Sequence, residues 1–311
     1  MIKLDANESP FNMPDSLYPI DSDLKQLKEK WGQFERIPSS YIYICNGTEE
    51  SVDLCIRLFA EPNSDEILSV SPTRSIYKKR ALVNRVSYKQ CPLNPSDFSL
   101  NSDLLLKSIS SQTKIILLCS PNAPTGNLFA QEDLLKILTN FKGLLIIDES
   151  YIDFCLYQSN LTLLNKYKNL ILIRSFSHGW SSAGIRMSAL IAHPDVISQF
   201  EQFGLTHPLN SLVILYAKNM LDRRIDVHKW VRQIVEERNK VILALKSLPL
   251  SLVVFPSEAN FVFVKGERIF EIYKYLLRHE IFVKYTDEGL RISIGMPRDN
   301  SVLLAALRTL K

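Results

Sequence analysis

Short, uninterrupted runs of apolar residues recur in the middle of this chain, at 114–119, 143–148 and 169–174. Their residues are apolar at consecutive positions and not at alternate ones, which is typical of strands buried on both faces. Such strands occur in parallel sheets that lie between layers of helices. The segment 49–60 predicts one such helix, because its apolar residues recur at helical spacing. The chain is therefore predicted to have an α/β fold with a mainly parallel sheet.

Other segments extend this pattern to most of the chain. Residues 1–25 contain three prolines and are expected to form an N-terminal arm with a short helix after it. Amphipathic helices are predicted for 227–248 and 267–278. Further strands are predicted at 41–45, 66–70, 187–193, 251–255, 260–264, 281–284 and 291–294. We therefore divide the chain into the arm (1–25), a large domain (26–220) and a small α+β domain (221–311).

The composition argues against several classes of protein. In 311 residues the formal net charge is +4 and the basic residues are dispersed, so no nucleic-acid partner is expected. The five cysteines have no metal-ligand spacing and are expected to be free thiols, so no metal site is predicted. No apolar run is long enough to cross a membrane, and the N-terminal residues lack the apolar core of a signal peptide. We expect a cytoplasmic protein without a membrane partner.

Polar residues follow several predicted strands, at the edge where ligands bind to parallel sheets. Gly47-Thr48-Glu49 lies between the strand at 41–45 and the helix at 49–60. A glycine permits a tight turn, and the free N–H groups at a helix N-terminus attract a phosphate group. Alone, the motif is also what an ordinary strand–helix turn contains.

Two charged residues in apolar surroundings are further candidates for a site. Asp148 ends the strand at 143–148, where a carboxylate is costly unless it is paired, although it could instead cap the segment that follows. Arg291 begins the apolar strand at 291–294. An arginine in such a strand binds an anion or forms an internal salt bridge. The residues alone leave these alternatives open.

The segment 174–186 carries a resemblance to a known family. It reads Arg-Ser-Phe-Ser-His-Gly-Trp-Ser-Ser-Ala-Gly-Ile-Arg and resembles the cofactor-lysine segment of the aminotransferases that use pyridoxal phosphate (PLP), Ser-x-Ser-Lys followed by Gly-x-Arg. Ser175, Ser177, Gly184 and Arg186 stand at matching positions. His178 stands at the lysine position, and an imidazole has no primary amine with which to form the Schiff base to PLP.

Other motifs extend this resemblance over nearly the whole chain. Residues 120–126 (Ser-Pro-Asn-Ala-Pro-Thr-Gly), 148–151 (Asp-Glu-Ser-Tyr) and 290–295 (Leu-Arg-Ile-Ser-Ile-Gly) resemble the family's Asn-Pro-Thr-Gly, Asp-Glu-Ala-Tyr and Leu-Arg-Ile-x-x-Gly. Residues 5–10 (Asp-Ala-Asn-Glu-Ser-Pro) and 18–19 (Tyr-Pro) resemble the arm of histidinol-phosphate aminotransferases. The resemblance implies the fold of PLP-dependent transferases, which is aspartate aminotransferase-like, with a large domain and a smaller α+β domain.

The resemblance also implies roles for individual residues. Asp148 would pair with the pyridine nitrogen of the cofactor, and Tyr151 would donate to its phenolate oxygen. Asn7 and Arg291 would bind the substrate, with Arg291 on its α-carboxylate. Tyr18 would reach the PLP phosphate of the partner subunit, which implies a homodimer. The remaining cofactor-binding residues implied are Gly47, Thr48, Glu49, Arg74, Ser175, Ser177 and Arg186.

Three positions depart from the family's pattern. His178 replaces the Schiff-base lysine, and Ala123 replaces the asparagine that bonds the phenolate oxygen. Arg74 replaces a tyrosine that stacks on the cofactor ring. A guanidinium can stack on a flat ring, but over a protonated pyridine it meets a like charge.

These departures leave three hypotheses. In the first, which the resemblance favours, the chain acts on an amino-acid-like substrate, with or without a phosphate. It would use non-covalent PLP or pyridoxamine phosphate (PMP), with His178 as base and Tyr151 as a second catalytic residue; sugar dehydratases of the same fold are similar in this respect. In the second, the chain is a catalytically inactive homologue that binds a ligand or a partner. In the third, His178 is an engineered change.

Overall fold

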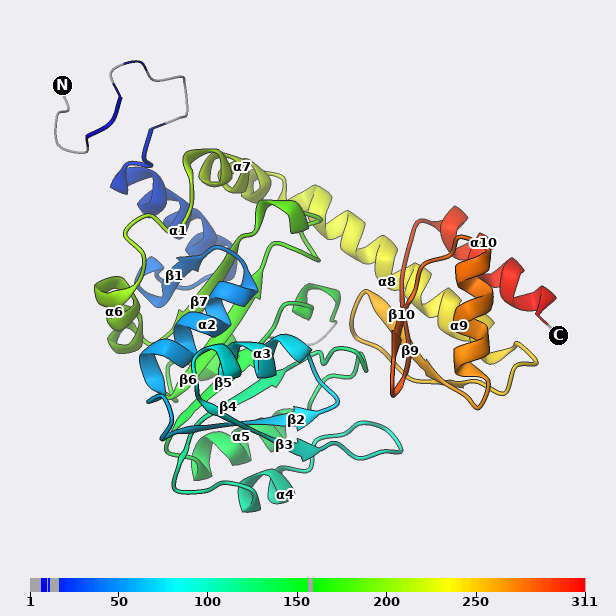
Figure 1. Cartoon of the computed structure of the whole chain (residues 1–311). Helices are drawn as coiled ribbons and strands as arrows, with labels where there is room; N and C mark the ends of the chain where they lie inside the picture. The colour runs from blue at the N-terminus through cyan, green and yellow to red at the C-terminus, as the bar shows by residue number, and fades with distance from the viewer. Residues whose placement is uncertain (1–6, 10, 12–16, 156–158, 311) are drawn as a thin grey trace.

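A seven-stranded sheet forms the centre of the protein in the computed structural model, which describes residues 7–9, 11, 17–155 and 159–310 (Figure 1). The strand order is β1-β7-β6-β5-β4-β2-β3. The strands are β1 (Ile42–Cys45), β2 (Glu66–Ser71), β3 (Ser87–Pro92), β4 (Thr113–Cys119), β5 (Leu144–Asp148), β6 (Leu170–Ser175) and β7 (Ser188–Ala192). Neighbours from β3 to β6 pair in parallel, and β7 pairs antiparallel with β6 and β1. The predicted α/β fold is confirmed.

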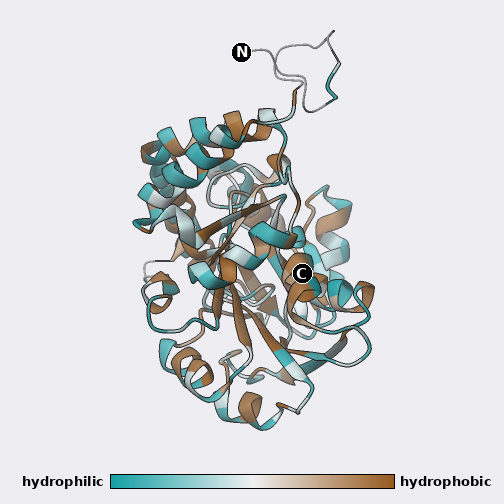
Figure 2. Ribbon diagram, turned by 90° about the vertical axis from the view of Figure 1, so that its left-hand side faces the viewer, coloured by the Kyte–Doolittle hydropathy of each residue, from teal (hydrophilic) through white to brown (hydrophobic). Residues whose placement is uncertain are grey.

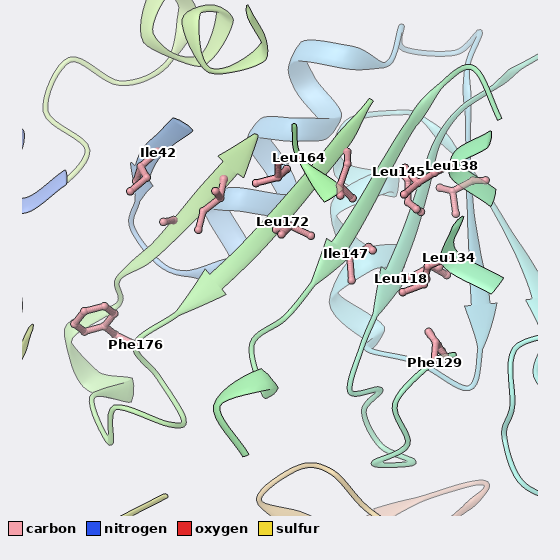
Figure 3. Packing of buried hydrophobic residues seen from close by; sticks show 14 of the residues in the cluster. Ile42, Leu118, Phe129, Leu134, Leu138, Leu145, Ile147, Leu164, Leu172 and Phe176 are labelled. Atoms are coloured by element: carbon pink, nitrogen blue, oxygen red, sulfur yellow. The ribbon is translucent and has the colours of Figure 1, made fainter. Parts of the chain in front are cut away.

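The consecutive apolar residues of the central strands are buried on both faces of the sheet. On one face Leu118, Ile147 and Leu172 belong to a single apolar cluster, which Figure 3 shows from close by. On the other face Leu117 and Ile146 belong to a second cluster. Because successive side chains of a strand point to opposite faces, a strand covered on both sides needs apolar residues at every position.

Helices form a layer over each face of this sheet. The first cluster receives side chains from α1 (Asp21–Glu35), α4 (Ser102–Lys107), α5 (Gln131–Asn140) and α7 (Ser211–Asp222). The second cluster receives them from α2 (Thr48–Phe59), α3 (Ser75–Val83) and α6 (Pro194–Phe203). In Figure 2 the strands are mainly brown and the helices carry teal residues, as this layering requires.

A second, four-stranded antiparallel sheet lies in the C-terminal part of the chain (Figure 1). Its strands, in the order β10-β11-β9-β8, are β8 (Val253–Val254), β9 (Phe261–Lys265), β10 (Lys284–Thr286) and β11 (Gly289–Ser293). The helices α8 (Arg224–Lys246), α9 (Ile269–Arg278) and α10 (Pro297–Thr309) pack against it. α8 links the two parts, because Val227 lies in the first cluster and Leu245 in the cluster of the small sheet.

Several elements have other bounds than predicted; β8, for example, covers only Val253–Val254 of the strand predicted at 251–255. Two further strands show the physical reason. The strand predicted at 281–284 is β10, which begins only at Lys284 and continues to Thr286, because residues 281–283 have no strand partner. β3 was missed, since it is an edge strand whose residues are mostly exposed and polar and therefore lack an apolar run. The division at residues 220 and 221 stays a prediction. Among the described residues, no helix is long and apolar enough to cross a membrane, and the expected cytoplasmic location stays a prediction.

Candidate active site

The parallel strands β2, β4, β5 and β6 end at the same edge of the large sheet. The loops that follow them line a cavity of about 740 Å³, to which Lys284 and Arg291 of the small sheet also contribute. The cavity therefore lies where ligands bind in open parallel sheets. Among its lining residues are five that the sequence singled out, namely Arg74, Ala123, Tyr151, His178 and Arg291.

Asp148, the last residue of β5, is completely buried at this edge. Its Oδ1 accepts hydrogen bonds from the backbone N–H of Ser150 at 3.0 Å and from the Ser150 hydroxyl at 2.5 Å. Its Oδ2 accepts one from the Tyr77 hydroxyl at 2.7 Å and another from Nη1 of Arg74. We call these four residues, Arg74, Tyr77, Asp148 and Ser150, the ring end of the site. The carboxylate expected to pair with a cofactor is paired within the chain.

Arg74 is the cation of this ring end. It stands directly before α3, and its side chain is 19% exposed. Its Nη1 donates to Asp148 and also lies 3.3 Å from the Ser150 hydroxyl. Burial lowers the pKa of the Arg74 guanidinium, but the Asp148 carboxylate and its neighbours turn the net shift upward. Arg74 is therefore a permanent positive charge in the lining of the cavity.

His178 lies in the loop after β6, and its ring stacks on that of Tyr151 with the centroids 4.5 Å apart. Burial lowers the pKa of His178 from 6.5 to about 4, so the imidazole is neutral near pH 7 and can accept a proton. The charges that also act on it are those of Arg74, Arg291 and Arg186, which lower its pKa, and that of Asp148, which raises it.

We call the residues expected around a cofactor phosphate the phosphate end, namely Gly47, Thr48, Ser175, Ser177 and Arg186. Gly47 has a φ of +83°, and a Cβ atom there would lie 2.7 Å from Nη2 of Arg186. The positive φ favours a glycine, whereas the exposed end of the Arg186 side chain could move away from a Cβ atom. Arg186 is exposed, and its Nη1 donates to the Ala183 carbonyl at 3.1 Å. The backbone N–H of Ser177 donates to the Ser175 hydroxyl at 3.1 Å.

The phosphate end also contains the N-terminus of α2. Helix α2 begins at Thr48, and the N–H groups of a first helical turn have no partner within the helix. The Thr48 hydroxyl lies 3.2 Å from that of Ser150, so this end adjoins the ring end. Glu49, expected to bind the cofactor, instead pairs with Arg80 at 3.3 Å. Backbone donors together with Arg186 favour an anion here.

Arg291 reaches the cavity from β11. Its guanidinium lies 5.3 Å from the centroid of the Phe261 ring, and its buried Nε has no hydrogen-bond partner. Within the described part of the chain it forms no ion pair, so the alternative of an internal salt bridge is not observed. A guanidinium that lines a cavity and has no carboxylate partner suits an incoming anion.

Two predicted site residues lie elsewhere in the single chain. Tyr18 and Asn7 line a second cavity of about 700 Å³. The Tyr18 ring stacks there on His207, with the centroids 4.7 Å apart. A role for Tyr18 in a partner subunit stays a prediction, and the arm residues 5, 6 and 10 lie outside the described residues.

Two residues of this region were not predicted as part of the site. Tyr77 bonds Asp148, and its spacing of three residues from Arg74 at the start of a helix is the signal that could have revealed it. Asn122 is buried and accepts a hydrogen bond from the Thr73 hydroxyl at 2.8 Å. It also donates to the Pro72 carbonyl at 2.9 Å and so ties the loop that carries Arg74 to the loop after β4.

The comparisons with known proteins show the family and the fold. Residues 18–307 match the family model of aminotransferase class I and II. The chain belongs to this aminotransferase family. It is 36% identical over 314 residues to the histidinol-phosphate aminotransferase of Parabacteroides distasonis, covering 99% of this chain and 90% of that protein.

Solved structures show the same fold. The histidinol-phosphate aminotransferase of Clostridium acetobutylicum superposes with a TM-score of 0.86 at 23% identity, over 94% of this chain and 90% of that one. That of Sinorhizobium meliloti, solved in complex with PLP, has a TM-score of 0.85 at 18% identity, over 95% and 83%. At this identity the solved structures support the fold of the aminotransferase and not its chemistry.

The ring end of this aminotransferase homologue does not fit the PLP ring. A carboxylate offers about four acceptor positions, and Asp148 already accepts four hydrogen bonds. At position 123 the alanine has no polar side-chain atom, and the neighbouring Asn122 is directed to Thr73 and Pro72. His178 cannot form a Schiff base. The phosphate end, in contrast, retains donors that suit a phosphate.

Proposed function

We propose that this aminotransferase homologue binds a small amino-acid-like anion that carries a phosphate group, and that it does not transaminate through a Schiff base. The observation that carries the proposal is the set of three arginines whose charges act on His178, opposed by Asp148. Arg74 already neutralises that aspartate. The cavity is lined by four basic residues, Arg74, Lys78, Lys284 and Arg291, and by two acidic ones, Asp287 and Glu288. This excess of basic residues favours an anionic ligand.

The two arginines that lie outside the ring end have different expected partners. Arg186 stands with Gly47 at a helix N-terminus, which suits a phosphate dianion. Arg291, with its unpartnered Nε, suits a carboxylate. The relatives of the chain are histidinol-phosphate aminotransferases, so L-histidinol phosphate is the first ligand to test.

Calorimetric titration of the full chain tests this function. We expect L-histidinol phosphate to bind at least about tenfold more tightly than L-histidinol, because a charge-assisted contact to phosphate contributes about 1.5–3 kcal/mol. Arg186→Gln should remove this difference. Arg278→Gln, which changes an exposed arginine of α9, is the matched control and should preserve it. Equal affinities for the two ligands in the unaltered protein would refute a phosphate-binding function.

A second, enzymatic candidate follows from the position of His178. Its neutral imidazole is stacked on Tyr151 beside the cavity, and it could serve as a base. The route with non-covalent PLP or PMP, which the resemblance favoured, additionally requires the pair of Arg74 and Asp148 to open. Deuterium exchange at the α-carbon of a bound amino acid, followed by NMR, tests this candidate. Exchange that His178→Ala abolishes would support it, and exchange that survives this change would exclude His178 as the base.

We also propose a homodimer. Tyr18 is 58% exposed and does not line the cavity that contains His178 in its own chain. It stacks on His207 there, and its exposed part is available to a partner subunit. Light scattering on the purified protein measures the mass directly. A monomer at micromolar concentration would contradict this proposal.

A further inference from the structure

We propose that Arg74 is a built-in substitute for the cofactor ring. Its guanidinium is the cation that Asp148 pairs with, so the site is complete without a cofactor, and neither PLP nor PMP binds through Asp148. This inference rests on the ring end alone. It therefore stands or falls independently of the proposed binding of a phosphorylated ligand.

Asp148 has no free acceptor position for a cofactor ring. The carboxylate is completely buried, and both of its oxygens accept two hydrogen bonds from groups of the chain. A pyridinium N–H would have to displace one of these donors. Ser150 provides two of these donors and is held close to the carboxylate by the short stretch of chain between them. Of the other two donors, Tyr77 and Arg74, only Arg74 has the same charge as a pyridinium, so it is the donor that the ring would displace.

Displacement from Asp148 would leave Arg74 without its counter-ion. Arg74 is held between Asp148 and the Ser150 hydroxyl, and it is largely buried. Without Asp148 its charge would remain at the cavity, where the basic lining residues Lys78, Lys284 and Arg291 outnumber the acidic Asp287 and Glu288. Separating a buried ion pair is strongly unfavourable when the freed charge finds no new partner. A protonated ring in its place would add another positive charge to this region.

The loop that carries Arg74 is tied to the loop after β4. Asn122 accepts from the Thr73 hydroxyl and donates to the Pro72 carbonyl, and it also donates to Thr125 at 2.7 Å. Buried amide contacts of this kind fix a loop in one conformation. Asn122 is therefore a positioning residue that holds the backbone of Arg74 against the loop after β4.

Cofactor binding by the full chain tests this inference. The protein would be titrated separately with PLP and with PMP, and bound cofactor measured by equilibrium dialysis and by the absorption spectrum. We expect no binding that depends on Asp148 in the unaltered protein, so any affinity that the phosphate end gives to PLP or PMP should be the same in Asp148→Asn. Arg74→Tyr should produce tighter, saturable, non-covalent binding, because it frees Asp148. In the Arg74→Tyr background, Asp148→Asn should weaken that binding at least tenfold.

Adding His178→Lys to Arg74→Tyr should further produce a borohydride-trappable adduct, whereas His178→Lys alone should not. Lys79→Tyr, at an exposed position of α3 that does not line the cavity, is the matched control and should bind cofactor no more tightly than the unaltered protein. Circular dichroism verifies folding, and Arg74→Gln replaces Arg74→Tyr if the latter does not fold.

Two results would overturn the inference. Saturable binding of PLP or PMP to the unaltered protein that Asp148→Asn weakens would show that the pair opens for the ring. Failure of both folded Arg74 variants to bind either cofactor more tightly than the unaltered protein would show that Arg74 is not what closes the site. Neither result depends on whether histidinol phosphate binds, so each is distinguishable from a failure of the proposed function.

Discussion

The ring end and the phosphate end lie side by side at one edge of the sheet, yet they differ in how their polar groups are used. At the ring end the completely buried Asp148 has all its acceptor positions filled by the chain. At the phosphate end Arg186 is exposed and stands beside the first turn of α2. The Thr48 and Ser150 hydroxyls, 3.2 Å apart, mark where the two ends meet.

This difference shows that one site can have its charged group paired within the chain at one end and remain available to an anion at the other. A cation supplied by position 74 satisfies the aspartate internally, so the buried charge has a partner even without a ligand. No comparable acid pairs with Arg186 or Arg291 among the residues that the structure describes. The two ends should therefore respond differently to substitution.

The largest expected effect is on folding stability when the ring end is broken. Asp148→Asn leaves the largely buried Arg74 without its counter-ion and should lower the free energy of unfolding by about 3 kcal/mol. Arg186→Gln, at the open end, should change it by less than about 0.5 kcal/mol. Urea unfolding measures both. The double variant Arg74→Gln with Asp148→Asn should recover about half of the loss, and equal effects of the two single changes would remove the distinction between the ends.

The next effect is a pH dependence that arises from His178, on which the charges of both ends act. Burial lowers its pKa to about 4, so between pH 4 and 6.5 the unfolded chain binds a proton that the folded chain does not. Its contribution to stability is fully present above pH 6.5 and is lost as the pH falls through about 4. The loss should be roughly 2–3 kcal/mol, measured as the difference between the unaltered protein and His178→Gln across this range. Parallel stability curves for the two proteins would contradict the burial of a neutral imidazole.

Asp153 provides a matched control of opposite sign. Burial raises the pKa of its carboxyl to about 6, and Arg174 opposes this shift. Its contribution is fully present below pH 3.8 and is lost as the pH rises through about 6. In the unaltered protein, Asp153 therefore lowers stability as the pH rises, whereas His178 raises it over the same range. Asp153→Asn should abolish the first effect, and His178→Gln should abolish the second.

A smaller effect is expected at Gly47 in the phosphate end. Gly47→Ala places a Cβ atom against the Arg186 guanidinium at a positive φ, so it should lower stability by about 1–2 kcal/mol and also weaken binding of a phosphate ester. Gly184→Ala is the control, since a Cβ there meets no atom within 4 Å. Thermal unfolding and calorimetric titration measure the two consequences. Unchanged phosphate binding in Gly47→Ala would place the anion elsewhere.

The smallest expected effect is a change in the pKa of His178 when the charge of Arg74 is removed. Arg74→Gln removes a charge that lowers the pKa of His178, so this pKa should rise toward its ordinary value. NMR titration of the imidazole measures the shift. Lys79→Gln, which changes a charge on the exposed side of α3, should leave the titration unchanged.

Much of the fold and the place of the site could be predicted from local sequence. Consecutive apolar residues predicted β4, β5 and β6, because a strand with both faces covered has no other pattern. The edge strand β3 could not be predicted, because its polar residues face solvent and its pairing is made only by the backbone. The start of β10 depends on its partner β11 and so was also misplaced.

The sequence by itself determined a mainly parallel α/β sheet, the family, and Asp148 and His178 after two strands that end at one edge of that sheet. Only the tertiary structure decided that Asp148 pairs with Arg74, a residue 74 positions earlier in the chain. Apolar periodicity and short motifs predict which residues are buried and where strands, helices and turns lie, and these are local properties of the chain. The partner of a buried charge depends on how two distant loops pack, and Asn122 makes that packing through contacts that no local pattern contains.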